Sequence, residues 1–361
     1  MKVLFIAPSS ATISGGSIAT QQTLRSLEPH CEIHHLACDV PEPNRPRMYA
    51  SAARAALTGR SYWEMSWRNS ELRAEVVRLH ARESFDVIHC EWLPSAVPLH
   101  GLDLPLVIRA LDVHFVDMER WAGDRWYWRE QARRFRRFEA EVLNAARAAV
   151  VLSREDEELL RACGVRNIVT IPPPRHVEPE NGASDEPLAV FIGRLDMAPN
   201  REAFFLFANE IWPSIRKRVR VVFAGGFPDA EVRRRADECG IELIAPLSDA
   251  DAARLFAEAR VFLSPVRSGT GIKIKTLDAM AYGKPMIGFR GAFRGVPVEH
   301  DVHALVAESP ADFARLFDEL IDDAPRRRAI GIAAREMIRM RFDGVSLGER
   351  LRDVYANACL R

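Results

Sequence analysis

The sequence predicts an α/β protein made of two doubly wound domains that face each other across a cleft. Two observations support this: in each half of the chain, short hydrophobic runs typical of strands alternate with helical stretches, and a proline-rich segment separates the halves. The length of 361 residues also exceeds that of a usual single domain, roughly 100–150 residues. Sheets of this kind bind ligands beyond the carboxyl ends of their strands, so we expect a functional site there.

The first half, residues 1–170, opens with a strand at residues 1–6 and a glycine-bearing segment that leads into a helix at residues 18–27. Its further strands are expected at residues 32–37, 87–90, 106–110 and 148–152. Residues 171–187 contain five prolines and no hydrophobic periodicity, so we interpret them as a linker.

The alternation restarts after the linker and continues over residues 188–340. Strands are expected at residues 188–192, 219–224, 241–243, 261–264 and 285–289. Helices are expected at residues 201–212, 229–239, 251–259, 273–281, 310–322 and 325–341. Each half therefore predicts a Rossmann-like domain, and residues 341–361 predict a last helix that could cross back to the first half.

Composition excludes several classes of protein. Fifty basic residues balance fifty acidic ones, which argues against nucleic-acid binding by the whole chain, since that needs concentrated positive charge. No apolar run approaches the roughly 18 residues of a membrane span, and the opening residues lack the layout of a signal peptide. The six cysteines are scattered, so we expect reduced thiols in a cytoplasmic protein and no metal site.

The lysines direct attention to one segment. Only five of the fifty basic residues are lysines, and Lys273, Lys275 and Lys284 fall within twelve residues of one another. A turn with Gly269 and Gly271 precedes the expected helix, and such turns expose backbone amides that suit a phosphate. An ordinary loop-to-helix turn with a solvated pair of lysines fits the same spacing equally well.

Several motifs resemble those of the retaining glycosyltransferases of family four, which have the GT-B fold. Residues 278–285, DAMAYGKP, resemble the helical "EAMA-x-G-x-P" motif of that family with Asp in place of Glu. Residues 191–195, FIGRL, are similar to its "VGRL" turn, and residues 224–226, AGG, to its "VG-x-G". Residues 247–265 and the glycine loop at residues 14–17 extend the resemblance, which covers residues 188–300 well and residues 1–170 in patches.

The resemblance implies a metal-independent enzyme that needs no cofactor and takes a nucleoside-diphosphate sugar as donor. The second half would bind the donor, and the first half a glycan or lipid-linked acceptor, as in bacterial polysaccharide assembly. Asp278 would hold the ribose, and Asp112 or His114, anchored by Arg109, would position the sugar. The residues implied in donor binding are Gly15, Gly16, Arg194, Gly269, Thr270, Gly271, Ile272, Lys273 and Asp278.

Three departures from the family leave alternatives open. Thr270 replaces the first glutamate of the family's pair, and Pro199-Asn200 replaces a lysine that follows the arginine of the "GRL" turn. We expect Lys273 or Lys275 to supply the missing charge and favour Lys273, which is closer to the glycines. Where the family usually has a site histidine, the sequence offers His114, two residues after Asp112, and the alternative is that Asp112 alone lines the site. A nucleotide-sugar epimerase and a catalytically silent donor-binding subunit therefore remain alternatives.

Two stretches of the first half combine arginines with aromatic residues. Residues 45–82 hold eight arginines against three acidic residues, and residues 109–137 hold eight against five. Both also contain tryptophans and tyrosines. Arginine with tryptophan at helical spacing is typical of helices on anionic membranes or around a pyrophosphate lipid. Solvated helices in which arginine stems cover tryptophan faces explain the same pattern.

Overall fold

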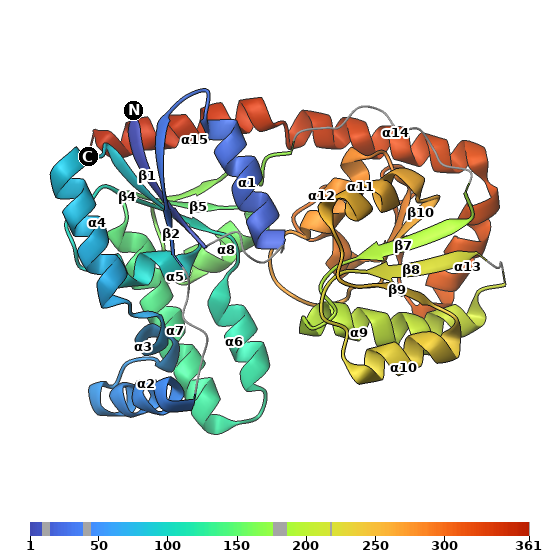
Figure 1. The fold of residues 1–361 in the computed structure, drawn as a ribbon, viewed down its shortest axis with the longest axis horizontal. Helices are drawn as coiled ribbons and strands as arrows, with labels where there is room; N and C mark the ends of the chain where they lie inside the picture. Colours follow the sequence, from blue (N-terminus) through green and yellow to red (C-terminus); the bar gives the residue numbers. More distant parts are fainter. Residues whose placement is uncertain (9–14, 39–44, 176–185, 217–218, 361) are drawn as a thin grey trace. The chain divides into compact units, whose positions relative to one another are not determined.

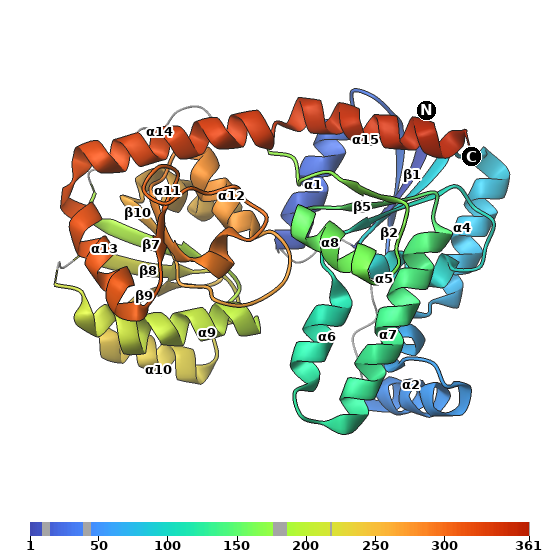
Figure 2. The same cartoon turned by 180° about the vertical axis from the view of Figure 1, so that it is seen from behind.

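The computed structural model describes residues 1–8, 15–38, 45–175, 186–216 and 219–360. The chain forms two compact units, one of residues Met1–Pro174 with Gly344–Arg361 and the other of residues Arg175–Asp343. Each unit is a parallel six-stranded sheet with helices on its faces (Figures 1 and 2). The α/β class predicted from the sequence is confirmed.

The sheet of the first unit has the strand order β2-β1-β3-β4-β5-β6. Its strands are β1 (Lys2–Ala7), β2 (Glu32–Ala37), β3 (Val87–Glu91), β4 (Leu106–Ala110), β5 (Ala148–Val151) and β6 (Ile168–Thr170). The central strands β3, β4 and β5 are buried at every residue, because helices cover both faces of the sheet. These strands are mostly apolar for the same reason, although His89, Glu91 and Arg109 are buried within them.

The helices of the first unit include one from the end of the chain. They are α1 (Gly15–Leu27), α2 (Arg45–Thr58), α3 (Tyr62–Trp67), α4 (Ser70–Glu83), α5 (Leu93–Ala96), α6 (His114–Ala122), α7 (Trp126–Ala145), α8 (Arg154–Ala162) and α15 (Gly344–Cys359). Leu347 and Leu351 of α15 share a buried cluster with Val3 and Phe5 of β1. The last helix therefore completes the core of the unit that contains the first strand.

Four helices of the first unit form a group of their own beside its sheet (Figure 1). This group, the helical arm, comprises α2, α3, α6 and the first part of α7, that is, residues 45–68 and 114–137. Ala55, Tyr62 and Met65 make a small core in it, against which Trp63 and Trp128 pack. The arm thus has a small apolar centre of its own, which Trp63 connects to the larger core on one face of the sheet.

The sheet of the second unit has the strand order β12-β11-β10-β7-β8-β9. Its strands are β7 (Leu188–Ile192), β8 (Arg220–Ala224), β9 (Glu242–Ile244), β10 (Val261–Ser264), β11 (Met286–Phe289) and β12 (Leu305–Ala307). Its α-helices are α9 (Ala198–Leu206), α10 (Ala230–Cys239), α11 (Asp249–Glu258), α12 (Ile274–Ala281), α13 (Pro310–Asp322) and α14 (Ala324–Arg341). The strand order changes direction between β7 and β10, and such a point is where open α/β sheets bind ligands.

Most predicted elements appear with their ends shifted by a residue or two, but three predictions were incomplete. The short strands β6 and β12 were not predicted. The helix expected at residues 201–212 begins earlier, at Ala198, and passes into a π-helical turn, Phe207–Ile211. Within the expected linker, the backbone amide of Arg175 donates to Phe342 at 2.7 Å, while residues 176–185 lie outside the described residues.

Candidate functional site

The predicted donor residues of the second unit gather at the carboxyl ends of β7, β8 and β10. Gly193 follows β7 and Gly225 follows β8, and these two backbones run very close together. A Cβ on Gly225 would lie 1.9 Å from the carbonyl oxygen of Gly193, so only glycine fits there. At this point the ends of the two strands present backbone atoms without side chains, because both residues are glycines.

The glycine turn after β10 is the second part of this candidate site. Gly269 has a φ of 98° and Gly271 a φ of 67°, which side chains other than glycine rarely adopt. The Ser268 hydroxyl donates to Glu202 of α9 at 2.8 Å, which fastens the turn to that helix. The turn ends at Ile272, which is buried, and α12 begins two residues later. The first amides of a helix have no intrahelical acceptor, so this helix start can bind an anion.

Lys273 lies at the N-cap position of α12 and turns back over its own loop. Its Nζ donates to the carbonyl oxygens of Thr270, at 2.6 Å, and Gly271, at 3.2 Å. These bonds neutralise the carbonyl ends of the turn, which would otherwise repel an anion. In this structure Lys273 therefore organises the glycine turn.

The side chain of Lys275, in the first turn of α12, extends to the carboxyl end of β7. Its Nζ lies 2.5 Å from Oδ1 of Asn200 and 4.0 Å from the centre of the Phe191 ring. A Cβ on Gly193 would be 3.1 Å from the same nitrogen, which places the ammonium at the end of β7. Burial, together with the positive charge of Lys273, holds the pKa of Lys275 well below its usual range. Protonating Lys275 is unfavourable without a ligand, so an anionic ligand beside this lysine would stabilise its charged form.

Arg194 lies next to this lysine in the turn after β7. Its guanidinium pairs with Asp196 through contacts of 3.1 and 2.5 Å and lies 5.1 Å from the centre of the exposed Phe227 ring. Hydrogen bonding from Arg194 lowers the pKa of Asp196. The arginine side chain remains 30% exposed, so a ligand can reach it.

Asp278 lies one turn further along α12, against a residue that the sequence analysis missed. Its Oδ1 is 3.1 Å from Nε of Arg175, whose side chain is only 2% exposed. Burial raises the pKa of Asp278, and the charge of Arg175 opposes that rise. Arg175 follows three prolines in the expected linker, where nothing in the local pattern marks it as part of a site. The Asp278 side chain stays partly exposed, at 21%.

The predicted residues of the first unit lie on two elements. Gly15 and Gly16 are exposed at the start of α1, whereas Ser14 of the same motif lies outside the described residues. Asp112 is in the loop after β4, and His114 begins α6. The structure thus places Asp112 and His114 at the carboxyl end of the central strand β4.

Glu139 of α7 fixes the position of His114. Its buried carboxylate accepts the backbone amides of His114, at 3.1 Å, and Phe115, at 2.9 Å, and so caps α6. Nδ1 of His114 lies 3.8 Å from Oε1 of Glu139, and the rings of Trp67 and Trp92 flank the imidazole. Burial disfavours the imidazolium, but the nearby carboxylates of Glu139, Asp112 and Asp117 outweigh it and raise the pKa of His114.

The expectation that Arg109 anchors Asp112 or His114 was wrong. Arg109 is fully buried, and its Nη1 bonds Glu91, at 2.5 Å, and Thr23, at 3.0 Å. Glu91 in turn bonds Nε2 of His89 at 2.8 Å, and Nδ1 of His89 bonds the hydroxyl of Tyr355 at 2.8 Å. This chain of contacts joins α1, β3, β4 and α15, so it serves the stability of the first unit.

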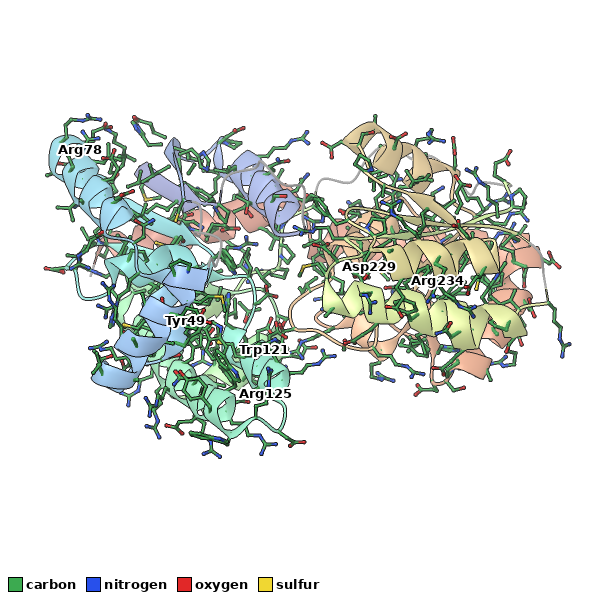
Figure 3. All side chains as sticks on the ribbon, turned by 60° about the horizontal axis from the view of Figure 1, so that its bottom comes forward. Tyr49, Arg78, Trp121, Arg125, Asp229 and Arg234 are labelled. Atoms are coloured by element: carbon green, nitrogen blue, oxygen red, sulfur yellow. The ribbon has the colours of Figure 1, made fainter. Side chains whose placement is uncertain are left out.

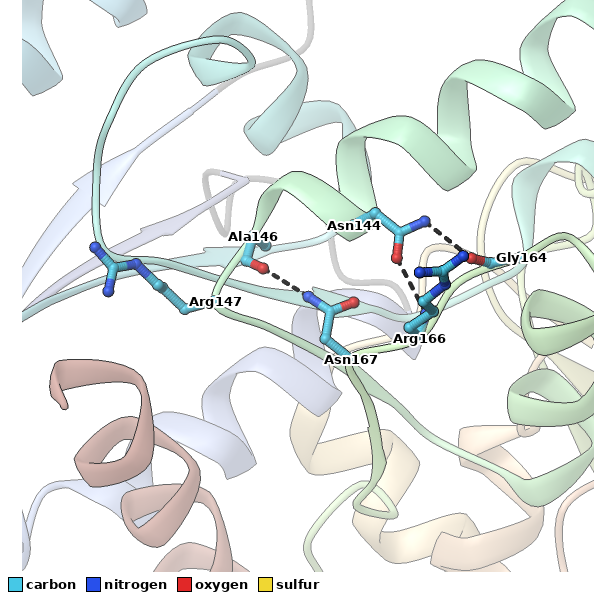
Figure 4. Close-up of a pocket in the computed structure, with 6 residues that line it drawn as sticks. All are labelled: Asn144, Ala146, Arg147, Gly164, Arg166 and Asn167. Carbon is cyan, nitrogen blue, oxygen red and sulfur yellow. Dashed lines mark hydrogen bonds between the residues drawn. The ribbon is translucent and has the colours of Figure 1, made fainter. Parts of the chain in front are cut away.

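Other features of the described residues do not compete with this site. Figure 4 shows a shallow hollow lined by Asn144, Ala146, Arg147, Gly164, Arg166 and Asn167, at the amino ends of β5 and β6. Its asparagines bond the neighbouring loop backbone, as in Asn144 to Gly164 at 3.0 Å, which is a structural role. In the part of the chain that the structure describes, no group of three His, Cys, Asp or Glu side chains could share a metal ion. No helix in that part is long and apolar enough to cross a bilayer.

Comparison with known proteins relates the second unit to one enzyme family. Residues 186–323 match the family model described as glycosyl transferases group 1. The chain is 25% identical, over 185 residues, to a D-inositol 3-phosphate glycosyltransferase of Corynebacterium aurimucosum, an alignment that covers 47% of this chain and 43% of that protein. The aligned stretches span less than half the length of the curated relatives that the chain matches.

Solved structures similar to this one cover nearly the whole chain. HepE of Anabaena, solved with UDP and glucose, has a TM-score of 0.72 at 14% identity and covers 99% of both chains. Sucrose-phosphate synthase of Thermosynechococcus elongatus has a TM-score of 0.75 at 15% identity and covers 99% of this chain and 98% of its own. The fold is therefore that of the GT-B glycosyltransferases.

Proposed function

We propose that the protein is a retaining, metal-independent glycosyltransferase. It moves a sugar from a nucleoside-diphosphate sugar to a glycan or lipid-linked acceptor, in bacterial polysaccharide or glycoconjugate assembly on the cytoplasmic side. One observation carries the proposal: Asn200 joins the ammonium of Lys275 to the backbone of Arg194 at the carboxyl end of β7, where the backbones of Gly193 and Gly225 meet. The family model over residues 186–323 and the UDP complex of HepE support the same ligand class.

In this proposal Arg194 and Lys275 bind the diphosphate of the donor. Arg194 exchanges its contact with Asp196 for phosphate oxygens, and Lys275 exchanges its contact with Asn200 in the same way. The first backbone amides of α12 add donors, while Lys273 holds the turn around Gly269, Thr270, Gly271 and Ile272 in shape. Preorganised charge of this kind stabilises the leaving diphosphate, which is the task that a divalent cation performs in metal-dependent enzymes.

Asp278 and residues of the first unit have further roles in the proposal. The carboxylate of Asp278 accepts a hydrogen bond from a ribose hydroxyl, while Arg175 orients that carboxylate and favours its charged form. Gly15 and Gly16 allow backbone to approach the substrate, and Asp112 or His114 positions the sugar ring. His114 is the better candidate of the two, because Glu139 and two tryptophan rings hold its imidazole in place.

A ligand screen followed by product analysis tests the proposal. The thermal midpoint of unfolding is measured with UDP, GDP and their sugars, because a ligand that binds only the folded state raises the midpoint. We expect one nucleoside diphosphate and its sugar to do so without added metal. Transfer with retention of the anomeric configuration supports the proposal. A change of the nucleotide sugar without an acceptor indicates an epimerase, and binding without any turnover indicates a silent subunit. No stabilisation by any nucleotide would overturn the proposal.

A further inference from the structure

The end of the helical arm exposes large apolar side chains. Tyr49 and Leu57 of α2 are 73% and 87% exposed, and Trp121 and Trp126 of the α6–α7 hairpin are 53% and 79% exposed. Figure 3 shows Tyr49, Trp121 and Arg125 on the side of the arm that faces the viewer. Among the tryptophans of the described residues, only Trp121 and Trp126 are exposed. The five other tryptophans are buried or partly buried, and the two exposed rings indicate a binding partner.

The exposed ring of Trp121 packs against other aromatic rings of the arm. The ring of Trp121 packs edge-on against Trp128, with 4.8 Å between ring centres, and against Trp63, with 6.2 Å. Trp128 packs in turn on Tyr62, at 5.4 Å, which belongs to the small core of the arm. Because the rings are already fixed, inserting them into another phase costs little conformational entropy.

The arm also concentrates positive charge. Residues 45–68 hold five arginines and one acidic residue, and residues 114–137 hold seven arginines and four acidic residues, in a chain whose net charge is zero. The single acid of the first stretch, Glu64, is buried between Arg60, at 2.6 Å, and Arg68, at 3.0 Å. Arg125 lies 4.1 Å from the centre of the Trp121 ring, so cationic and aromatic groups meet at the exposed end.

We propose that the end of the helical arm docks on an anionic lipid surface. Tryptophan and tyrosine rings are stable at the boundary between headgroups and acyl chains, and arginines are attracted to the negative charge of an anionic leaflet. A second copy of the chain fits this end poorly, because a two-fold interface would set the arginines of one arm against those of the other. The docking is independent of the donor site and brings the protein to the surface where a lipid-linked acceptor resides.

Vesicle co-sedimentation of the full chain tests the docking. Vesicles of phosphatidylcholine alone are compared with vesicles that also contain phosphatidylglycerol, at physiological salt. The apolar part is removed in the double variant Trp121→Ala/Trp126→Ala, with Met340→Ala, an equally exposed residue of α14, as control. The charge is reversed in Arg54→Glu/Arg133→Glu, both exposed on the arm, with Arg234→Glu on α10 as control.

We expect binding to the phosphatidylglycerol vesicles only, and about a tenfold or larger loss of partitioning in each arm variant. The two controls should bind like the unmodified chain, as should Lys275→Met, which separates docking from donor binding. Equal binding to both kinds of vesicle, no binding to either, or unchanged binding of the arm variants would each overturn the proposal. Dimerisation that the tryptophan substitutions abolish, without vesicle binding, would assign the surface to a second copy instead.

Discussion

The ammonium of Lys275 lies 2.5 Å from Oδ1 of Asn200, while Nδ2 of the same asparagine donates to the carbonyl oxygen of Arg194 at 2.8 Å. Asn200 therefore joins the lysine of α12 to the arginine that follows β7. In the family that the sequence resembles, a lysine stands near position 199 or 200. Here the positive charge reaches the same strand end from the start of α12, and the asparagine holds it there.

This arrangement predicts unequal roles for the two lysines. Lys275→Met should weaken UDP binding by about tenfold or more, since one charge about 4 Å from a phosphate contributes roughly 4 kcal/mol before desolvation. Lys273→Met should have a smaller effect, because its ammonium bonds the carbonyls of its own turn. Isothermal titration calorimetry with UDP measures both, and Lys2→Met in the first unit is a control for the loss of charge.

The thermal stability of the Lys275→Met variant without ligand shows whether a loss of affinity results from misfolding. The pKa of Lys275 is lower in the folded chain than in the unfolded chain, so the folded chain binds the lysine proton less tightly. Lys275 therefore lowers the free energy of unfolding at pH values below about 10. The variant should therefore unfold at the same or a higher temperature than the parent. An equal loss of affinity in both lysine variants would contradict the assignment of Lys275.

The ribose role of Asp278 predicts a loss of discrimination between UDP and 2′-deoxy-UDP. The unmodified chain should prefer UDP, because the Asp278 carboxylate accepts a hydroxyl that the deoxy ligand lacks. In Asp278→Asn the preference should shrink severalfold, with most of the loss in UDP affinity. Competition binding measures the ratio, and Asp312→Asn, a carboxylate at the start of α13, is the control. A preference retained in full would remove Asp278 from the ribose site.

Glu139 predicts the protonation of His114. Its contacts raise the pKa of His114, so this histidine stabilises the first unit fully below the unfolded-state pKa of about 6.5 and loses that contribution as pH rises through the raised value. Glu139→Gln should lower the pKa of His114, which histidine ring resonances report in an NMR titration. The ring resonances of His30, which follows α1, are the reference in the same spectra. An unaltered curve for His114 would show that Glu139 does not control it.

The buried contacts of Tyr355 predict a stability effect without a binding effect. Tyr355→Phe removes the hydroxyl that bonds His89 and should lower the free energy of unfolding by about 1–2 kcal/mol. Denaturant unfolding, followed by circular dichroism, measures the change. UDP affinity should stay constant, because the second unit contains the proposed diphosphate site. A large loss of UDP affinity in a folded Tyr355→Phe protein would contradict this division of roles.

Hydrophobic periodicity was enough to predict the α/β class and most strands, because β7, β8 and β10 are buried runs bounded by glycine or proline. It could not predict contacts between residues distant in sequence. Arg175 beside Asp278 and Glu139 beside His114 depend on tertiary packing, which no local pattern records. The choice between Lys273 and Lys275 depends on where α12 begins, and helix ends are the least certain part of any pattern.

A crystal structure of the protein with UDP tests the central claim most directly. We predict that the diphosphate lies at the carboxyl ends of β7, β8 and β10, with its oxygens within hydrogen-bond reach of Lys275, Arg194 and the first amides of α12. We also predict that no metal ion bridges it to the protein. A diphosphate bound elsewhere, or one that leaves the contact between Lys275 and Asn200 undisturbed, would contradict the account.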